Sequence, residues 1–194
     1  MEMQGFERRV LMSRPYGWFS RSAVVPWLLR FARLPDEADV LEVGCGSGWN
    51  ADGLLRRFLR WHLTATDFDP DMVGLASRRL ARYSDRVTVE RADATALDYS
   101  ERSFDVVVGI GVWHHVGVWE KATLEAGRVL RPGGVLVLLD LLEEFFGDVN
   151  EKLFPPTRAY DIDELLATLG DAGFRRVRLR RTGGRIYRLV AEKG

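Results

Sequence analysis

The stretch VLEVGCGSG at residues 40–48 decides the fold, because an apolar run leads directly into three glycines at every second position. Apolar and β-branched residues predict a buried strand over 39–44, and the glycines predict a tight turn after it. Residues 49–61 then have the apolar spacing of a helix. Since only glycine lets the backbone pass very close to a ligand, this strand–turn–helix unit predicts a binding site. The alternative is a tight turn that binds nothing.

Strands and helices alternate along the rest of the chain. The predicted strands are 62–69, 86–93, 104–111 and 135–142, and the predicted helices are 70–83, 119–130 and 161–173, with a turn at 132–134. This alternation is typical of a parallel sheet. Residues 174–194 contain two strand-like runs around Gly183 and Gly184, which predicts a hairpin and a reversed last strand. The expected fold class is α/β: a Rossmann-like doubly wound sheet, mostly parallel with an antiparallel last strand.

Domain organisation is expected to be simple, with one domain over residues 1–194. Apolar residues at helical spacing in the N-terminal segment 1–34 predict a helical lid that Pro35 and Asp36 end. Residues 143–160, with Gly147 and the pair Pro155-Pro156, predict an irregular insertion on the substrate side. Sequence repeats and linker-like tracts do not occur.

Composition excludes several classes of protein. The 28 basic and 28 acidic residues cancel, which gives no overall bias toward nucleic acid or anionic membranes. The longest apolar stretch, 135–142, is interrupted by Asp140 and is far shorter than the roughly 20 residues of a membrane span. The single cysteine, Cys45, is compatible with a reducing cytoplasm, which is the predicted location. His62 is remote in sequence from the histidine pair and Cys45 lies in the glycine turn, so we expect no metal site.

The glycine turn has a further feature, an acidic residue at Glu42 followed by Gly44, Gly46 and Gly48. This pattern resembles the first motif of the class I S-adenosylmethionine-dependent methyltransferases, in particular their small-molecule, UbiE-like group (methyltransferase type 11). A dinucleotide-binding fingerprint has a different glycine spacing. The resemblance covers roughly residues 38–192 and includes the Pro-Gly-Gly turn. It implies S-adenosylmethionine as cofactor and S-adenosylhomocysteine as product.

The remaining cofactor residues follow later strands. Asp67 ends the second strand, 19 residues after Gly48, where a carboxylate can accept both ribose hydroxyl protons. A helix cap is its alternative role, but Asp69 directly before Pro70 is the better cap, which leaves Asp67 for ribose. The resemblance implies further contacts, with ordinary core or loop roles as the alternatives. These contacts are Cys45 and Ser47 in the turn, Phe68 and Met72 near adenine and ribose, Asp93 and Ala94 at the adenine ring, and Gly109 and Ile110 beside the methionine portion.

Candidate catalytic residues are His114 and His115, an adjacent titratable pair after the fourth predicted strand. A neutral imidazole can take a proton from an acceptor, although methyl transfer from a sulfonium requires mainly positioning. Their alternative role is to orient the loop. Tyr16, Trp18, Phe19 and Tyr160 are predicted substrate-side aromatics, with the protein core as the alternative.

These patterns predict a methyltransferase acting on a small-molecule acceptor. Alternating arginines at 176, 178 and 180 leave open an RNA or protein acceptor, although a solvated sheet face is favoured. Two other classes stay open: a NAD-binding oxidoreductase and a non-catalytic cofactor-binding protein. Monomer and homodimer are equally compatible with the sequence.

Overall fold

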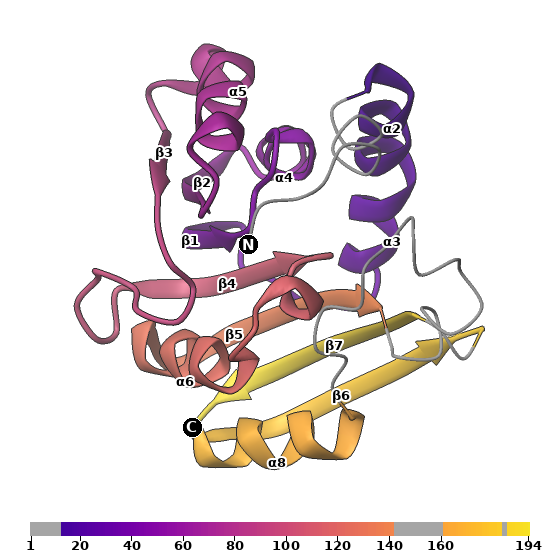
Figure 1. The fold of residues 1–194 in the computed structure, drawn as a ribbon, viewed down its shortest axis with the longest axis vertical. Coiled ribbons are helices and arrows are strands. Elements are labelled where there is room, and N and C mark those ends of the chain that lie inside the picture. The colour runs from indigo at the N-terminus through magenta and orange to yellow at the C-terminus, as the bar shows by residue number, and fades with distance from the viewer. Residues whose placement is uncertain (1–12, 142–160, 184–185) are drawn as a thin grey trace.

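A seven-stranded sheet forms the centre of the computed structural model, which describes residues 13–141, 161–183 and 186–194 (Figure 1). The strand order is β3-β2-β1-β4-β5-β7-β6. The strands are β1 (Glu37–Val43), β2 (Arg60–Asp67), β3 (Val87–Arg91), β4 (Phe104–Ile110), β5 (Leu130–Leu141), β6 (Phe174–Thr182) and β7 (Ile186–Lys193). Only β7 runs antiparallel to its neighbours, β5 and β6. The predicted fold class is therefore confirmed.

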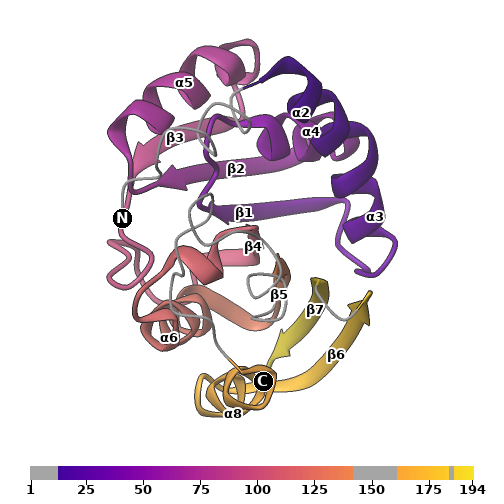
Figure 2. The same ribbon diagram turned by 45° about the vertical axis from the view of Figure 1, so that its right-hand side comes forward.

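Helices cover both faces of the sheet (Figures 1 and 2). One side carries α4 (Trp49–Arg57), α5 (Pro70–Leu80) and a helical N-terminal segment, and the other carries α6 (Trp119–Val129) and α8 (Ile162–Asp171). The N-terminal segment consists of α2 (Arg14–Phe19), the π-helical turn η1 (Ser20–Val24) and α3 (Val25–Leu29). Two short 3₁₀ turns, η2 (Ala81–Tyr83) and η3 (Trp113–His115), complete the described helices.

Two apolar cores result from the alternation of side chains along the central strands. Val40 and Val106 belong to the core beneath α4 and α5, whereas the next residues, Leu41 and Val107, belong to the core beneath α6 and α8. Strands buried on both faces read as continuous apolar runs, which is why β4 and β5 were recognisable in the sequence.

The strand order reverses direction between β1 and β4. The chain runs outward through β1, β2 and β3, and then returns to the other side of β1. Loops that follow β1 and β4 therefore diverge, and ligands of open α/β sheets bind in the crevice between them at the carboxyl ends of the strands.

Helix boundaries differ from the sequence prediction at two places. The helix expected over 49–61 ends at Arg57, because Trp61 is fully buried in β2, stacks on Phe58 at 3.8 Å and donates its indole N–H to the carbonyl of Pro35. The N-terminal helix expected to reach Leu34 ends at Leu29. The hydrogen bonds after it join residues three apart, from the N–H of Phe31 to the carbonyl of Leu28 and from the N–H of Ala32 to the carbonyl of Leu29, which is a tighter turn than an α-helix. Both errors arose because apolar spacing continued past the true helix end.

Most other boundaries agree closely with the prediction, but β5 begins at Leu130 and not at Val135, where the predicted strand began. The turn expected at 132–134 lies inside β5, where the pairing register with β4 shifts. The hairpin of β6 and β7 is confirmed by antiparallel pairing from Arg176 to Thr182. The predicted insertion 143–160 lies outside the described residues. In the described ranges, none of the helices has both the length and the apolar character needed to cross a membrane.

Candidate cofactor and active site

The glycine turn between β1 and α4 has the conformation that its sequence predicts. Gly44, Gly46 and Gly48 all have positive φ, at 69°, 52° and 83°. A Cβ on Gly44 would lie 2.2 Å from the side chain of Val112, whereas one on Gly46 would meet nothing within 4 Å. The backbone is therefore closely packed at Gly44 and open at Gly46, where a ligand can approach.

Glu42, the last acidic residue before the turn, is almost completely buried, with 1% of its surface exposed. Neither oxygen of its carboxylate has a hydrogen-bond partner among the described residues. Burial, and to a smaller extent the charge of Asp67, raises the pKa of Glu42 to about 8. A buried carboxyl without partners is costly unless a ligand supplies a donor or a positive charge.

Asp67, at the end of β2, supports the turn directly. One carboxylate oxygen accepts the N–H of Gly46 at 2.8 Å, and the other accepts the N–H of Asp69 at 2.9 Å. Asp69 caps α5 by accepting the N–H of Asp71, which confirms the predicted cap. Asp67 is therefore not the helix cap, as predicted. The sequence had also suggested that its carboxylate makes no other contact, but both oxygens already accept a backbone N–H. It is half-buried, and each oxygen retains a lone pair for a hydroxyl donor.

The rest of the turn is tightly held. Cys45 donates its N–H to the carbonyl of Thr66 at 2.8 Å, and Ser47 is buried. Burial, with smaller contributions from Glu42 and Asp67, raises the pKa of the Cys45 thiol. The buried thiol is therefore protonated at neutral pH, and Cys45 packs in the core beneath the turn.

Residues predicted near adenine differ in exposure. Phe68 is 47% exposed with the guanidinium of Arg91 above its ring, whereas Met72 is fully buried. Asp93 is exposed, and one of its oxygens accepts both the N–H and the hydroxyl of Thr95, which fixes the loop after β3. Ala94 is partly buried against the core of α6 and α8. Phe68 and Asp93 are thus accessible to a ligand, and the role of Met72 remains a prediction.

The end of β4 presents a glycine that the sequence analysis passed over. The side-chain position at Gly109 is filled by the ring of Trp113, and Ile110 is 8% exposed within the core. Gly111 instead has a φ of 65°, is exposed, and has nothing within 4 Å of an added Cβ. The glycine itself, directly after an apolar strand, was the available signal. Any contact of Gly109 or Ile110 with a ligand would involve the backbone.

His114 forms a buried pair with Asp140, a residue that the sequence analysis noted only as an interruption of the apolar run in β5. The Nδ1 atom of His114 hydrogen-bonds one oxygen of Asp140, and the His114 backbone N–H donates to the other oxygen at 3.1 Å. Both side chains are at least 94% buried. Burial alone would raise the pKa of Asp140, but attraction and hydrogen bonding from His114 hold it below its ordinary value. This carboxylate fixes the orientation of the imidazole.

The ring of His115 is tilted by 42° against that of His114, with ring centroids 3.9 Å apart, and His115 is more accessible. Because η3 follows β4 directly, both histidines lie at the carboxyl edge of the sheet, as the glycine turn does. Among the residues that the structure describes, no cluster of three side chains that could ligate a metal ion occurs.

Helix α2, which carries Tyr16, Trp18 and Phe19 of the predicted substrate-side aromatics, packs next to the glycine turn. A Cβ on Gly17 would lie 2.1 Å from the ring of Trp49, so α2 packs directly on the first residue of α4. Trp18 is 64% exposed and Phe19 is 53% exposed, which excludes the alternative that they belong to the core. Tyr16 is half-buried. Tyr160 lies outside the described residues.

Comparison with known proteins agrees with this geometry. Residues 40–134 match a family model described as a methyltransferase domain. A probable S-adenosylmethionine-dependent methyltransferase of Mycobacterium tuberculosis is 35% identical over 161 residues, which are 81% of this chain and 55% of that protein. A solved S-adenosylmethionine-dependent methyltransferase from Aquifex aeolicus has a TM-score of 0.77 at 20% identity, covering 98% of this chain and 99% of that one. The chain belongs to the class I S-adenosylmethionine-dependent methyltransferases.

The chain is also similar to the ubiquinone/menaquinone biosynthesis C-methyltransferase UbiE of Bdellovibrio bacteriovorus. The two are 30% identical over 144 residues, 74% of this chain and 59% of that protein. The chain thus spans somewhat over half the length of the two curated relatives. The predicted family is confirmed, while the acceptor and the roles of individual residues remain predictions.

Proposed function

We propose that this methyltransferase binds S-adenosylmethionine at the carboxyl edge of its sheet and transfers the methyl group to a small-molecule acceptor. The observation that carries this proposal is the buried carboxyl of Glu42 before an open glycine turn. Its two oxygens have no hydrogen-bond partner in the part of the chain that the structure describes. S-adenosylmethionine carries a positive charge and an amino group, so it offers what a buried carboxylate lacks. The residues of the turn fit that cofactor.

The cofactor would be held by groups from three strand ends. Gly46 and Gly111 leave the backbone open, Asp67 has lone pairs for ribose hydroxyls, and Asp93 retains an oxygen for the adenine amine. S-adenosylmethionine supplies a methyl group on a positively charged sulfur, which is already activated for displacement. The chain therefore has to position and desolvate the acceptor.

His114 is the side chain best placed to accept a proton from the acceptor. Its Nδ1 side is occupied by Asp140, which favours the tautomer with the proton on Nδ1 and leaves Nε2 as the basic nitrogen. Such an imidazole can accept a proton from an acceptor hydroxyl, amine or activated carbon. Asp140 is then a positioning residue for His114.

A small-molecule acceptor is supported by the exposed aromatics Trp18 and Phe19 beside the glycine turn and by the balanced net charge. The name of the UbiE relative, a quinone-pathway C-methyltransferase, points in the same direction. We propose a single domain in which residues 1–34 and 143–160 border the acceptor, and a cytoplasmic location on the basis of the single cysteine.

The test is isothermal titration with S-adenosylhomocysteine and, separately, with NAD. We expect wild-type protein to bind S-adenosylhomocysteine and not NAD. Because Asp67 holds Gly46, Asp67→Ala is expected to weaken binding about 10- to 100-fold, whereas the exposed Asp98→Ala is expected to bind as the wild type does. Thermal unfolding of both variants controls for loss of the fold.

Two outcomes contradict the proposal. Retention of NAD without S-adenosylhomocysteine would indicate an oxidoreductase. Binding of S-adenosylhomocysteine with no methyl transfer to any pool of small molecules, and with transfer to tRNA or protein, would assign a macromolecular acceptor instead.

A further inference from the structure

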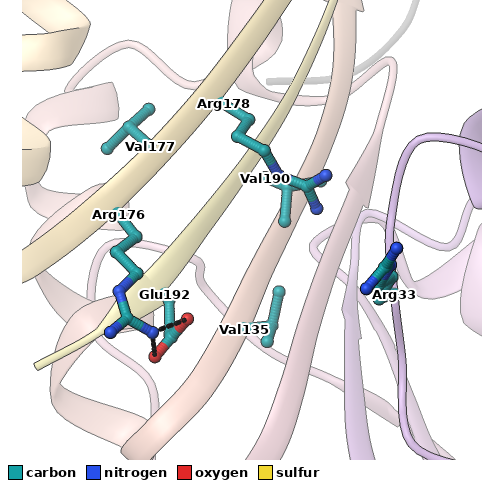
Figure 3. Close-up of a pocket in the computed structure, with 7 residues that line it drawn as sticks. All are labelled: Arg33, Val135, Arg176, Val177, Arg178, Val190 and Glu192. Carbon is teal, nitrogen blue, oxygen red and sulfur yellow. Dashed lines mark hydrogen bonds and ion pairs between the residues drawn. The ribbon is translucent and has the colours of Figure 1, made fainter.

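A hollow lies away from the proposed methyltransferase site, on the face of β5, β7 and β6 opposite α6 and α8 (Figure 3). Its volume is about 490 Å³. Val135 and Val190 form part of its apolar lining, and Arg33 and Arg178 flank it. Arg33 precedes β1 and Val135 lies in the first half of β5, so the hollow is at the amino ends of these strands. The glycine turn and His114 are at the carboxyl ends.

The charges around this hollow do not balance. Arg176 is paired with Glu192, with one guanidinium nitrogen 3.0 and 3.2 Å from the two carboxylate oxygens. Arg178 extends across Val190 toward the side from which Arg33 approaches (Figure 3). Within ranges 13–141, 161–183 and 186–194, neither Arg33 nor Arg178 forms an ion pair with an acidic side chain. Among the described residues, the hollow is therefore flanked by two guanidinium groups without an acidic partner, of which that of Arg178 lies 5.5 Å from the centre of the Phe31 ring.

A neighbouring pair adds to the excess of positive charge. Arg180 on β6 is directly opposite Arg188 on β7, and like charges in this position destabilise a sheet. Arg188 is 6% exposed, and the central carbon of its guanidinium lies 3.9 Å from the centre of the Trp27 ring. Its buried Nε has no hydrogen-bond partner among the described residues. Burial, followed by the charge of Arg180, lowers the pKa of Arg188. A bound anion would relieve this repulsion.

We propose that this hollow binds an amphipathic organic anion, with its phosphate or carboxylate group between Arg33 and Arg178 and its apolar part over Val135 and Val190. Guanidinium groups match the geometry of both oxyanions, and the valines favour an apolar chain over a bare ion. The site is separate from the cofactor crevice, so ligand binding here does not depend on methyl transfer.

Isothermal titration with n-octyl phosphate at low ionic strength tests the proposal. We expect the double variant Arg33→Gln/Arg178→Gln to weaken binding about tenfold or more, because both charge-assisted contacts are lost. The matched control Arg175→Gln/Arg181→Gln removes the same charge from β6, where Arg181 has the opposite orientation to Arg178, and should leave binding within about twofold. Both variants should bind S-adenosylhomocysteine as wild type does, which controls for folding.

The chemistry of the ligand is tested by two further probes. Inorganic phosphate and the uncharged n-octyl glucoside should each bind at least about tenfold more weakly than octyl phosphate. Inorganic phosphate lacks the apolar chain, and octyl glucoside lacks the anionic group. Equal weakening in the control variant would reduce the effect to non-specific attraction and overturn the proposal. It is also overturned if octyl phosphate does not bind while a polyuridine oligonucleotide does, because the face would then be a nucleic-acid surface.

Discussion

Glu42→Gln tests the central inference that a buried carboxyl, without a hydrogen-bond partner among the described residues, lies at the cofactor crevice. In the folded protein the pKa of Glu42 is about 8, against an ordinary value of 4.5. The folded state therefore retains a proton that the unfolded state releases above pH 4.5. The stability linked to this proton is fully present below pH 4.5 and is lost as the pH rises toward 8.

The size of the effect follows from these two values. Between pH 4.5 and pH 7 the unfolded chain ionises while the folded protein stays mostly protonated. Each pH unit in this window corresponds to about 1.4 kcal/mol, so the free energy of unfolding should fall by about 3 kcal/mol. Glutamine has nearly the same shape and cannot ionise. The variant should therefore gain stability relative to wild type by about 3 kcal/mol over the same window.

Urea denaturation at several pH values between 4.5 and 8 measures this difference. Glu101→Gln, an exposed site, is the matched control and should show no such trend. S-adenosylhomocysteine titration of Glu42→Gln supplies an independent readout, because glutamine cannot carry the negative charge that would pair with the ammonium group of the ligand, and the variant should bind more weakly. A stability difference that does not change with pH would refute the reasoning, since Glu42 would then be ionised or hydrated in the folded protein.

Three further predictions concern the same region. Gly46→Ala should cost only about 1 kcal/mol of stability, from strain at positive φ in open space, but should weaken S-adenosylhomocysteine binding more than tenfold; unchanged binding would place the ligand elsewhere. In ¹⁵N NMR spectra His114 should carry its proton on Nδ1, and Asp140→Ala should shift that tautomer, with His62→Gln used for assignment. Asp52→Asn should lower stability at pH 7 by about 1–3 kcal/mol. Burial raises the pKa of Asp52, but hydrogen bonds, led by that from Tyr83, outweigh burial and lower this pKa below 3.8. The stability difference between wild type and Asp52→Asn should therefore shrink as the pH falls below 3.8. A difference that stays constant with pH would contradict the lowered pKa.

The sequence predicted the fold well because its signals were local. Strand β4 is a continuous apolar run, and Asp69 before Pro70 marks the start of α5. The paired glycines after β6 mark the hairpin that reverses β7. Each of these features depends on the chemistry of a few adjacent residues, so it can be predicted without knowledge of the tertiary structure.

Features that depend on distant residues were missed. The helix prediction ran to Trp61 because its apolar spacing fitted, whereas burial between Phe58 and the Pro35 carbonyl assigns it to β2. Asp140 is 26 residues from His114, and only the pairing of β4 with β5 brings the two side chains together. Asp67 has an acceptor role toward Gly46 that its sequence position could not indicate.

The buried acidic groups of the candidate cofactor site give the crevice a preference in charge. Burial and, after it, the charge of Asp67 raise the pKa of Glu42, and burial followed by the charges of Glu42 and Asp67 raises the pKa of the Cys45 thiol. Adding an anion here would increase this repulsion, whereas a positively charged group relieves it. The pyrophosphate of a dinucleotide would enter an already acidic cluster, but the sulfonium and amino groups of S-adenosylmethionine would balance it. The electrostatics of these residues thus favour the same cofactor as the spacing of the glycines, although the two arguments have different physical origins.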